Sequence, residues 1–223
     1  MAKVKQNKIL LLFLIFNLYT YCGYAQFDAD NDNTFFGGLA VGTNFCQVDG
    51  DNFAGYHKPG WNFGAIIYTK LADHLAASME LLYAQKGSRA GALQVPKYAN
   101  DQSTIITDYK IQLNYLEVPI LINYFDRRKS NFGAGLAYAH LIKSKEIYRN
   151  DQGAVFENDA RLFPFRKPDL NFILNANAHI YKGLFFNLRF QYSLLSIRNS
   201  YNYITGRKEQ FNNLWCTRIL YIF

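Results

Sequence analysis

Charged residues are scarce in this sequence: they make up 18% of its 223 residues, while half of the residues are hydrophobic. Disordered chains combine low hydrophobicity with high net charge, so this composition excludes disorder. Methionine is also scarce, with two residues, against 19 phenylalanines, 17 tyrosines and 15 glycines. Aromatic residues favour strands and glycine is costly inside helices, so this mixture favours many short strands over a helical bundle.

Long hydrophobic runs are missing except near the N-terminus. There, three lysines precede an apolar run over 9–18, and Gly23 and Ala25 occupy the two positions that signal peptidase reads. The run is shorter than the roughly 20 apolar residues of a membrane-spanning helix. We therefore interpret residues 1–25 as a cleaved secretory signal peptide. A lipoprotein signal at Cys22 is disfavoured, because bulky residues precede that cysteine.

The basic excess of the chain belongs in large part to this signal. The full sequence has 24 basic and 17 acidic residues, and the signal contains three of the basic ones, so the mature chain has 24 − 3 = 21 against 17 and a net charge of +4. A charge of this size does not predict a nucleic-acid partner.

The mature chain shows apolar residues in strict alternation with polar ones. From Phe186 to Leu194 every second residue is apolar and the residues between them are polar. A period of two predicts a strand with one apolar face. Alternation of this kind predicts eight strands, over 35–49, 60–70, 74–88, 105–125, 131–143, 168–181, 184–198 and 211–223.

The connections between these strands alternate in length. Three are short, at 72–73, 126–130 and 182–183. Four are long and polar, at 50–59, 89–104, 144–167 and 199–210. An even strand number with this asymmetry is typical of outer-membrane proteins. The predicted fold class is thus all-β: an eight-stranded antiparallel transmembrane β-barrel over 35–223, with short periplasmic turns, long extracellular loops and both termini periplasmic.

A soluble β-sandwich shows the same alternation and is the main alternative. Three features favour the barrel. The polar faces carry Asn, Gln and Gly more than charge, and aromatic residues gather at strand ends, as in a membrane-interface girdle. The last strand ends on Phe223, with Tyr221 two positions earlier, and a terminal aromatic residue on an alternating strand is a tag for the barrel assembly machinery.

Several stretches resemble the PorT-type outer-membrane β-barrel family, which is common in Bacteroidota and often labelled porin-like. They are GLAVGTNFCQV over 38–48, PGWNFG over 59–64, ELLYAQKG over 80–87 and NYLEVPILINY over 114–124. The resemblance implies an integral outer-membrane barrel. The family's namesake is needed for type IX protein secretion, while most members have no assigned role. Secretion-machinery or other envelope proteins are the partners that the resemblance implies.

Charged residues are predicted inside the barrel. By strand parity Glu80, Glu117, Arg189 and Arg218 face the lumen, which in an eight-stranded barrel is just wide enough for side chains to fill. We expect the two carboxylates to pair with the two guanidiniums and to fill the lumen. A charged constriction that selects ions, as in a narrow porin, is the alternative.

One irregularity is predicted in the strand over 105–125. The apolar residues change parity near Tyr115 and Leu116, which predicts a β-bulge in this strand. Pro119 lies just beyond it and cannot donate a ladder hydrogen bond.

Two cysteines remain in the mature chain, Cys46 on the first strand and Cys216 on the last, both with lumen parity. The barrel closes where these strands meet, so a disulfide is one alternative and two free thiols are the other. We favour the free thiols.

No metal site, cofactor or catalytic centre is predicted. The four histidines fall in different elements without metal-ligand spacing. Residues 26–34 begin like a calcium loop but lack its glycine and glutamate, so we interpret them as a flexible tail. His140 has lipid-facing parity, as the base of a lipid-modifying enzyme would, but Ile142 stands where a nucleophile is needed.

The predicted function is that of a monomeric, non-enzymatic outer-membrane barrel in the envelope, surrounded by outer-membrane lipid and associated with the envelope or with secretion. A narrow porin for small solutes and a lipid-modifying enzyme remain as alternatives.

Overall fold

The computed structural model describes residues 34–51, 55–90, 106–150, 152–157, 164–198 and 209–223. The predicted signal peptide and nearly all of the predicted tail lie outside these ranges. Within them, no helix is long and apolar enough to cross a membrane.

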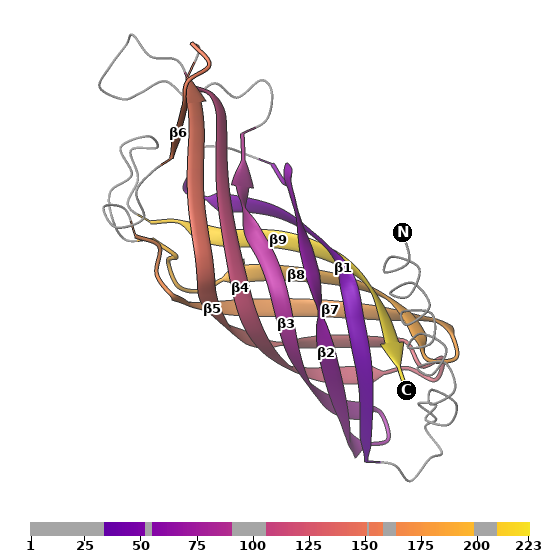
Figure 1. The fold of residues 1–223 in the computed structure, drawn as a ribbon. Coiled ribbons are helices and arrows are strands. Elements are labelled where there is room, and N and C mark those ends of the chain that lie inside the picture. The colour runs from indigo at the N-terminus through magenta and orange to yellow at the C-terminus, as the bar shows by residue number, and fades with distance from the viewer. Residues whose placement is uncertain (1–33, 52–54, 91–105, 151, 158–163, 199–208) are drawn as a thin grey trace, which may run out of the picture.

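Eight long antiparallel strands form the wall of a closed barrel (Figure 1). They are β1 (Phe35–Asp49), β2 (Lys58–Ala72), β3 (Leu75–Arg89), β4 (Ile106–Phe125), β5 (Asn131–Asn150), β7 (Pro168–Tyr181), β8 (Leu184–Ser193) and β9 (Phe211–Ile222). Each strand pairs with its neighbour along the chain, β9 pairs with β1, and a short strand β6 (Val155–Glu157) pairs with the far end of β5. The predicted eight-stranded antiparallel barrel is confirmed.

The two ends of the barrel differ. The connections β2–β3, β4–β5 and β7–β8 are short and lie at one end, together with the start of β1 and the C-terminus (Figure 1). The backbone N–H of Phe223 donates to the carbonyl of Gly37 over 2.9 Å, which holds the C-terminus in the wall. We call this the short-turn end and the other the long-loop end. At the short-turn end, the wall is therefore hydrogen-bonded between the first and last strands up to the last residue.

Two predicted strand boundaries are wrong, both at the long-loop end. β5 continues to Asn150 instead of ending near residue 143, because it stays paired with β4 and gains β6 as a second partner. β8 ends at Ser193 instead of 198, and only an isolated bridge between Arg198 and Gln210 continues its pairing. The wall is therefore taller on the side of β4 and β5.

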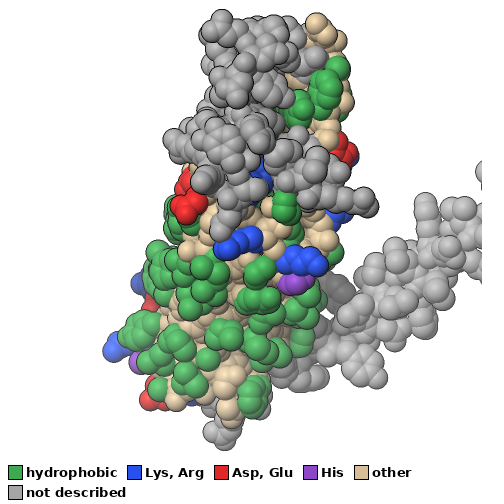
Figure 2. Space-filling model, turned by 90° about the vertical axis from the view of Figure 1, so that its left-hand side faces the viewer, with side chains coloured by type: hydrophobic (Ala, Val, Ile, Leu, Met, Phe, Trp, Pro, Cys, Tyr) green, Lys and Arg blue, Asp and Glu red, His purple; other side chains and the backbone are tan. Residues whose placement is uncertain are grey.

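The outer surface carries a band of hydrophobic side chains (Figure 2). The period of two places these side chains outside and leaves their neighbours inside. In β4, for example, Leu116 and Ile120 are exposed while Glu117 and Leu121 are buried. An apolar surface that surrounds the molecule is unfavourable in water and is suited to lipid.

The interior consists of layers of different polarity. A hydrophobic cluster lies toward the short-turn end and contains Phe36, Ala40, Ile66, Tyr68, Ala76, Phe125, Phe185, Leu220 and Ile222. A second cluster lies toward the long-loop end and contains Val48, Tyr109, Ile111, Leu113, Tyr115, Ala139, Leu141, Phe165 and Ile197. Between these clusters the buried side chains are mainly polar and charged. The interior is therefore packed with side chains and apolar toward both ends.

The predicted β-bulge lies in a different strand. Four inward-facing residues of β4 keep one parity past the expected position: Ile111, Leu113, Tyr115 and Glu117. The register shifts where Asn114 pairs with Lys143 and Tyr115 with Leu141, so the extra residue is Ile142 of β5. The prediction failed because the interior changes from polar to apolar here. The apolar residues therefore change from the outward to the inward positions, although β4 itself continues without an extra residue at this point.

Candidate functional site

Glu80 of β3 is the centre of the first buried charge cluster. Its two carboxylate oxygens accept from the Nη2 of Arg189 over 2.5 Å and the Nη1 of Arg218 over 2.7 Å. Both guanidiniums are held further by amides, because the Nε of Arg189 donates to Asn175 and the Nε of Arg218 to Asn187. All three charged side chains are buried, so each arginine has an oriented anionic partner out of bulk water.

The space for Arg218 is provided by a glycine on the neighbouring strand. A Cβ atom at Gly42 of β1 would lie 2.7 Å from the Cγ of Arg218 and 2.1 Å from the carbonyl oxygen of Thr217. Both distances are far below van der Waals contact, so the close approach of β1 and β9 at this point requires glycine.

Lys86 of β3 is the centre of the second cluster, nearer the long-loop end. Its Nζ lies 2.5 Å from the Oε1 of Glu117 and 3.7 Å from the Oδ2 of Asp169, and it donates to Asn171 over 3.0 Å. Gln191 donates to the same oxygen of Glu117 over 3.2 Å. One lysine of β3 therefore joins two carboxylates from β4 and β7, which lie on either side of β5 in the wall.

The structure places all four predicted lumen residues inside the barrel but pairs them differently. We expected Glu80 and Glu117 to share the two arginines. That pairing is wrong, because both arginines bind Glu80 and Glu117 binds Lys86. Lys86 has the same strand parity as Glu80, and Asp169 has the inward parity of β7. Counting alternate residues along each strand therefore identifies both as residues that face the lumen.

A third buried group lies at the long-loop end, above the hydrophobic band, and the alternation in the sequence does not indicate it. The guanidinium of Arg198 donates to both carboxylate oxygens of Glu146, over 3.3 and 2.7 Å, and lies 3.8 Å from the ring centre of Phe165. The hydroxyl of Tyr109 donates to the same carboxylate. Burial and the charge of Glu146 hold the pKa of Tyr109 well above its ordinary value, so it remains a neutral donor. Glu146 faces inward only because of the extra residue in β5, which no sequence pattern revealed.

The buried charges of the described residues balance. The buried acids are five: Asp51, Glu80, Glu117, Glu146 and Asp169. The buried bases are also five: Lys58, Lys86, Arg189, Arg198 and Arg218. The Glu80 cluster has one positive charge in excess and the Lys86 cluster has one negative charge in excess, so the two clusters together are neutral. The described interior therefore has no net charge of either sign along its length as a whole. This arrangement fills the barrel and holds its strands in register.

The two cysteines lie on neighbouring strands and face the lumen. In the β1–β9 ladder Cys46 pairs with Leu214 and Cys216 with Asn44, so the cysteines are diagonal neighbours. Both are buried, and both are free thiols in the structure. Among the described residues, no group of three His, Cys, Asp or Glu side chains could hold a metal ion.

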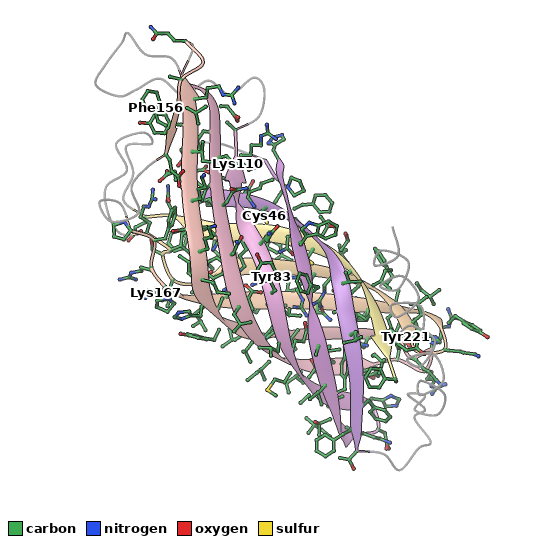
Figure 3. The ribbon with its side chains drawn as sticks, in the orientation of Figure 1. Cys46, Tyr83, Lys110, Phe156, Lys167 and Tyr221 are labelled. Carbon is green, nitrogen blue, oxygen red and sulfur yellow. The ribbon has the colours of Figure 1, made fainter. Side chains whose placement is uncertain are left out.

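The two C-terminal aromatic residues lie on the outside of the barrel. Tyr221 and Phe223 are 40% and 39% exposed, while Ile222 between them is buried (Figure 3 labels Tyr221). The ring of Phe223 passes next to Gly37, where a Cβ atom would lie 3.1 Å from it. Both rings are thus accessible from the lipid side at the short-turn end.

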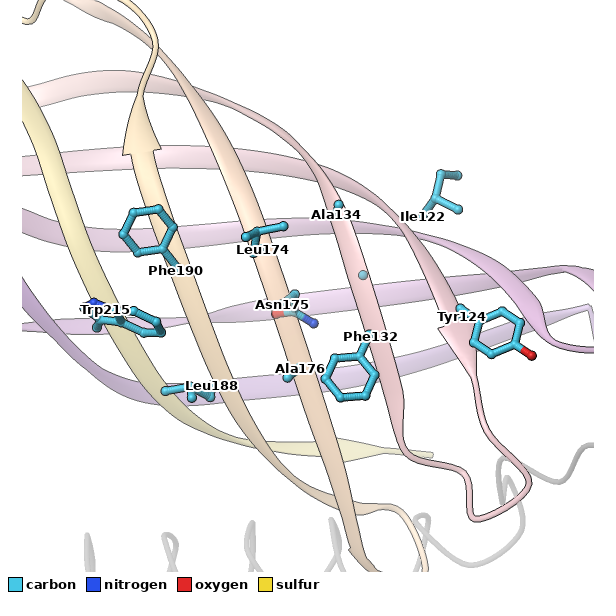
Figure 4. Close-up of a pocket in the computed structure, with 11 residues that line it drawn as sticks. Ile122, Tyr124, Phe132, Ala134, Leu174, Asn175, Ala176, Leu188, Phe190 and Trp215 are labelled. Carbon is cyan, nitrogen blue, oxygen red and sulfur yellow. The ribbon is translucent and has the colours of Figure 1, made fainter.

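A depression of about 700 Å³ lies on the outer surface over β4, β5, β7, β8 and β9 (Figure 4). Small residues, among them Ala134 and Ala176, form its floor, and Phe132, Phe190 and Trp215 stand around it. Its lining is mostly aromatic and aliphatic, so this depression is suited to lipid chains.

The fold, the apolar outer band and the charged interior together define an outer-membrane β-barrel protein. The chain belongs to the family described as "Outer membrane protein beta-barrel domain", whose model matches residues 24–199. No curated protein matches it by sequence.

Two solved structures resemble the chain in fold. Ail, the attachment invasion locus protein of Yersinia pestis, is 10% identical with a TM-score of 0.51, over 86% of this chain and 100% of that one. Neisserial surface protein A is 9% identical with a TM-score of 0.46, over 86% of this chain and 98% of that one. At these identities the likeness concerns the fold alone.

Proposed function

We propose that this protein is a non-enzymatic, monomeric outer-membrane barrel whose lumen is closed by its own side chains. The observation that carries the proposal is the layered interior: two ion-paired clusters, around Glu80 and Lys86, lie between two hydrophobic clusters. To pass, a solute would have to displace both the paired charges and the packed apolar groups. The lumen of an eight-stranded barrel is only wide enough for these side chains, so no open path remains beside them.

The proposal includes an orientation and a route to the membrane. The signal peptide over 1–25 directs the chain to the periplasm, and Tyr221 and Phe223 are recognised by the barrel assembly machinery. The short turns and both termini then face the periplasm, and the long connections face the medium, as in other outer-membrane barrels. The outward position of both aromatic rings supports their recognition by the assembly machinery, because neither ring is buried in the lumen.

Purified protein in planar bilayers is expected to show no large, stable conductance, because the interior is filled and its charges are paired. A water-filled porin reconstituted in the same way is the positive control. Correct folding of the sample is checked by heat-modifiable migration on gels. Stable, reproducible current steps from folded protein would overturn the closed-lumen proposal and favour the narrow porin instead.

The resemblance to PorT-type barrels supports an association with protein secretion as the finer role. Under that role, affinity capture from cross-linked outer membranes is expected to recover proteins of the type IX secretion machinery. A variant with residues 151–163 deleted, which leaves β5 intact, tests whether the long connection between β5 and β7 makes this contact. Capture of barrel assembly proteins alone would contradict the secretion role and leave a stand-alone envelope barrel.

A further inference from the structure

Four basic side chains gather on the outer surface at the long-loop edge of the hydrophobic band. They are His140 and Lys143 of β5, and Arg166 and Lys167 in the segment that leads into β7, and all four are exposed. Figure 2 shows basic side chains in a row directly above the hydrophobic band on this face, and Figure 3 shows Lys167 pointing away from the wall. We call these four residues the basic patch.

The backbone brings the four residues together across two strands. His140 is paired with Pro168, and the N–H of Leu141 donates to the carbonyl of Lys167 over 2.8 Å. Neighbouring strands lie about 4.8 Å apart. The extra residue Ile142 reverses the parity of β5, so that Lys143 faces outward on the same side as His140. Without this bulge Lys143 would point into the lumen.

The patch has no acidic partner among the residues that the structure describes. Asp169 lies next to it in the ladder but is buried and faces Lys86 inside the barrel. Glu157 binds Lys145 instead, over 2.8 Å. The exposed side chains of Lys143, Arg166 and Lys167 have no counter-charge among the described residues and are available to bind an external anion, and His140 adds an imidazole beside them.

The residues directly below the patch are suited to the boundary of a lipid leaflet. Tyr138, two residues before His140 on the short-turn side, is 52% exposed, and Phe172 and Leu136, paired across β5 and β7, continue the apolar surface toward the short-turn end. Tyrosine favours the headgroup level of a membrane, and the residues below it favour acyl chains. The charged heads of the patch therefore lie at the height of the lipid phosphates.

We propose that the basic patch binds the phosphate groups of a phosphorylated lipid of the outer leaflet, whose acyl chains lie along Tyr138, Leu136 and Phe172. This inference rests on the proposed outer-membrane orientation. Each cationic side chain near an anionic lipid surface contributes on the order of fivefold in affinity. The patch would anchor the barrel at a defined depth and surround it with a specific lipid.

The test measures lipid binding to folded, detergent-purified protein by native mass spectrometry, with phosphorylated lipid A and its dephosphorylated form as probes. The wild type is expected to retain the phosphorylated form alone. The variant Lys143→Gln/Arg166→Gln/Lys167→Gln is expected to lose about 100-fold in affinity, from three contributions of about fivefold each. The single variants Lys143→Gln and Lys167→Gln provide a measurement if the triple variant folds poorly.

The matched control is Arg127→Gln/Arg128→Gln/Lys129→Gln, which removes the same charge from the β4–β5 turn at the short-turn end and is expected to bind as the wild type does. Equal loss in both triple variants would show attraction by net charge and would overturn the proposal. Equal binding of the dephosphorylated lipid, full competition by millimolar inorganic phosphate, or no retention would also overturn it. Conductance of the same preparations tests the closed lumen separately, so the two failures are distinguishable.

Discussion

Replacing Glu80 with glutamine is expected to lower the free energy of unfolding of the barrel by about 3–5 kcal/mol. The substitution keeps the size of the side chain but leaves the guanidiniums of Arg189 and Arg218 buried without their shared carboxylate. Amide partners remain for both arginines, but they do not neutralise two positive charges. The measurement is a urea titration of protein refolded into lipid vesicles, followed by tryptophan fluorescence and by heat-modifiable migration.

Two further variants separate the buried charge from other effects of the substitution. Glu157→Gln removes a carboxylate from a solvent-exposed pair with Lys145 and is expected to cost at most about 1 kcal/mol. The variant Glu80→Leu/Arg189→Met/Arg218→Met removes the whole cluster and is expected to be more stable than Glu80→Gln alone, because no unpaired charge is left. If the triple variant proved less stable than the single one, the packing of these side chains would matter more than their charge.

Replacing Lys86 with methionine is expected to destabilise the barrel by a similar amount, about 3–5 kcal/mol. Here the charges left behind are negative, because Glu117 and Asp169 both lose the ammonium group that joins them. Two buried carboxylates then face each other without a cation. The same urea titration in vesicles measures the loss.

Lys145→Met is the matched lysine variant, since its partner Glu157 is exposed and can be solvated by water when left alone. The combination Lys86→Met/Glu117→Gln/Asp169→Asn is expected to recover a large part of the stability lost by Lys86→Met. Equal stability of Lys86→Met and the wild type would show that this lysine does not compensate the two carboxylates.

Much of the wall could be predicted because the period of two assigns each residue to the lipid or to the lumen without reference to any other strand. The inward positions of Glu80 and Arg189 followed from that count alone, and Lys86 follows from it as well. The prediction from alternation failed near Tyr115, because the interior of the barrel becomes apolar there while β4 keeps the same residues facing inward. Apolar residues that face an apolar interior give the same sequence pattern as a bulge that reverses the two faces of a strand.

The partners of Glu80 could not be predicted, because they lie on strands across the barrel. Glu80 on β3 meets residues of β8 and β9, and its distance from them depends on the stagger of all strands around the closed wall. The group around Glu146 was further hidden by the extra residue at Ile142, which changes what faces inward beyond it.

By itself the sequence predicted the class of protein: in an alternating, aromatic-rich chain, short and long connections in turn favour a closed barrel in lipid over a soluble sandwich. The reason is local, since the alternation within each strand shows which of its residues face the lumen and which face the lipid. Only the tertiary structure decided which charges pair, where the interior is apolar, and that the basic residues around Lys143 meet on one outer edge. Those features depend on closure and register, which bring together side chains far apart in the chain.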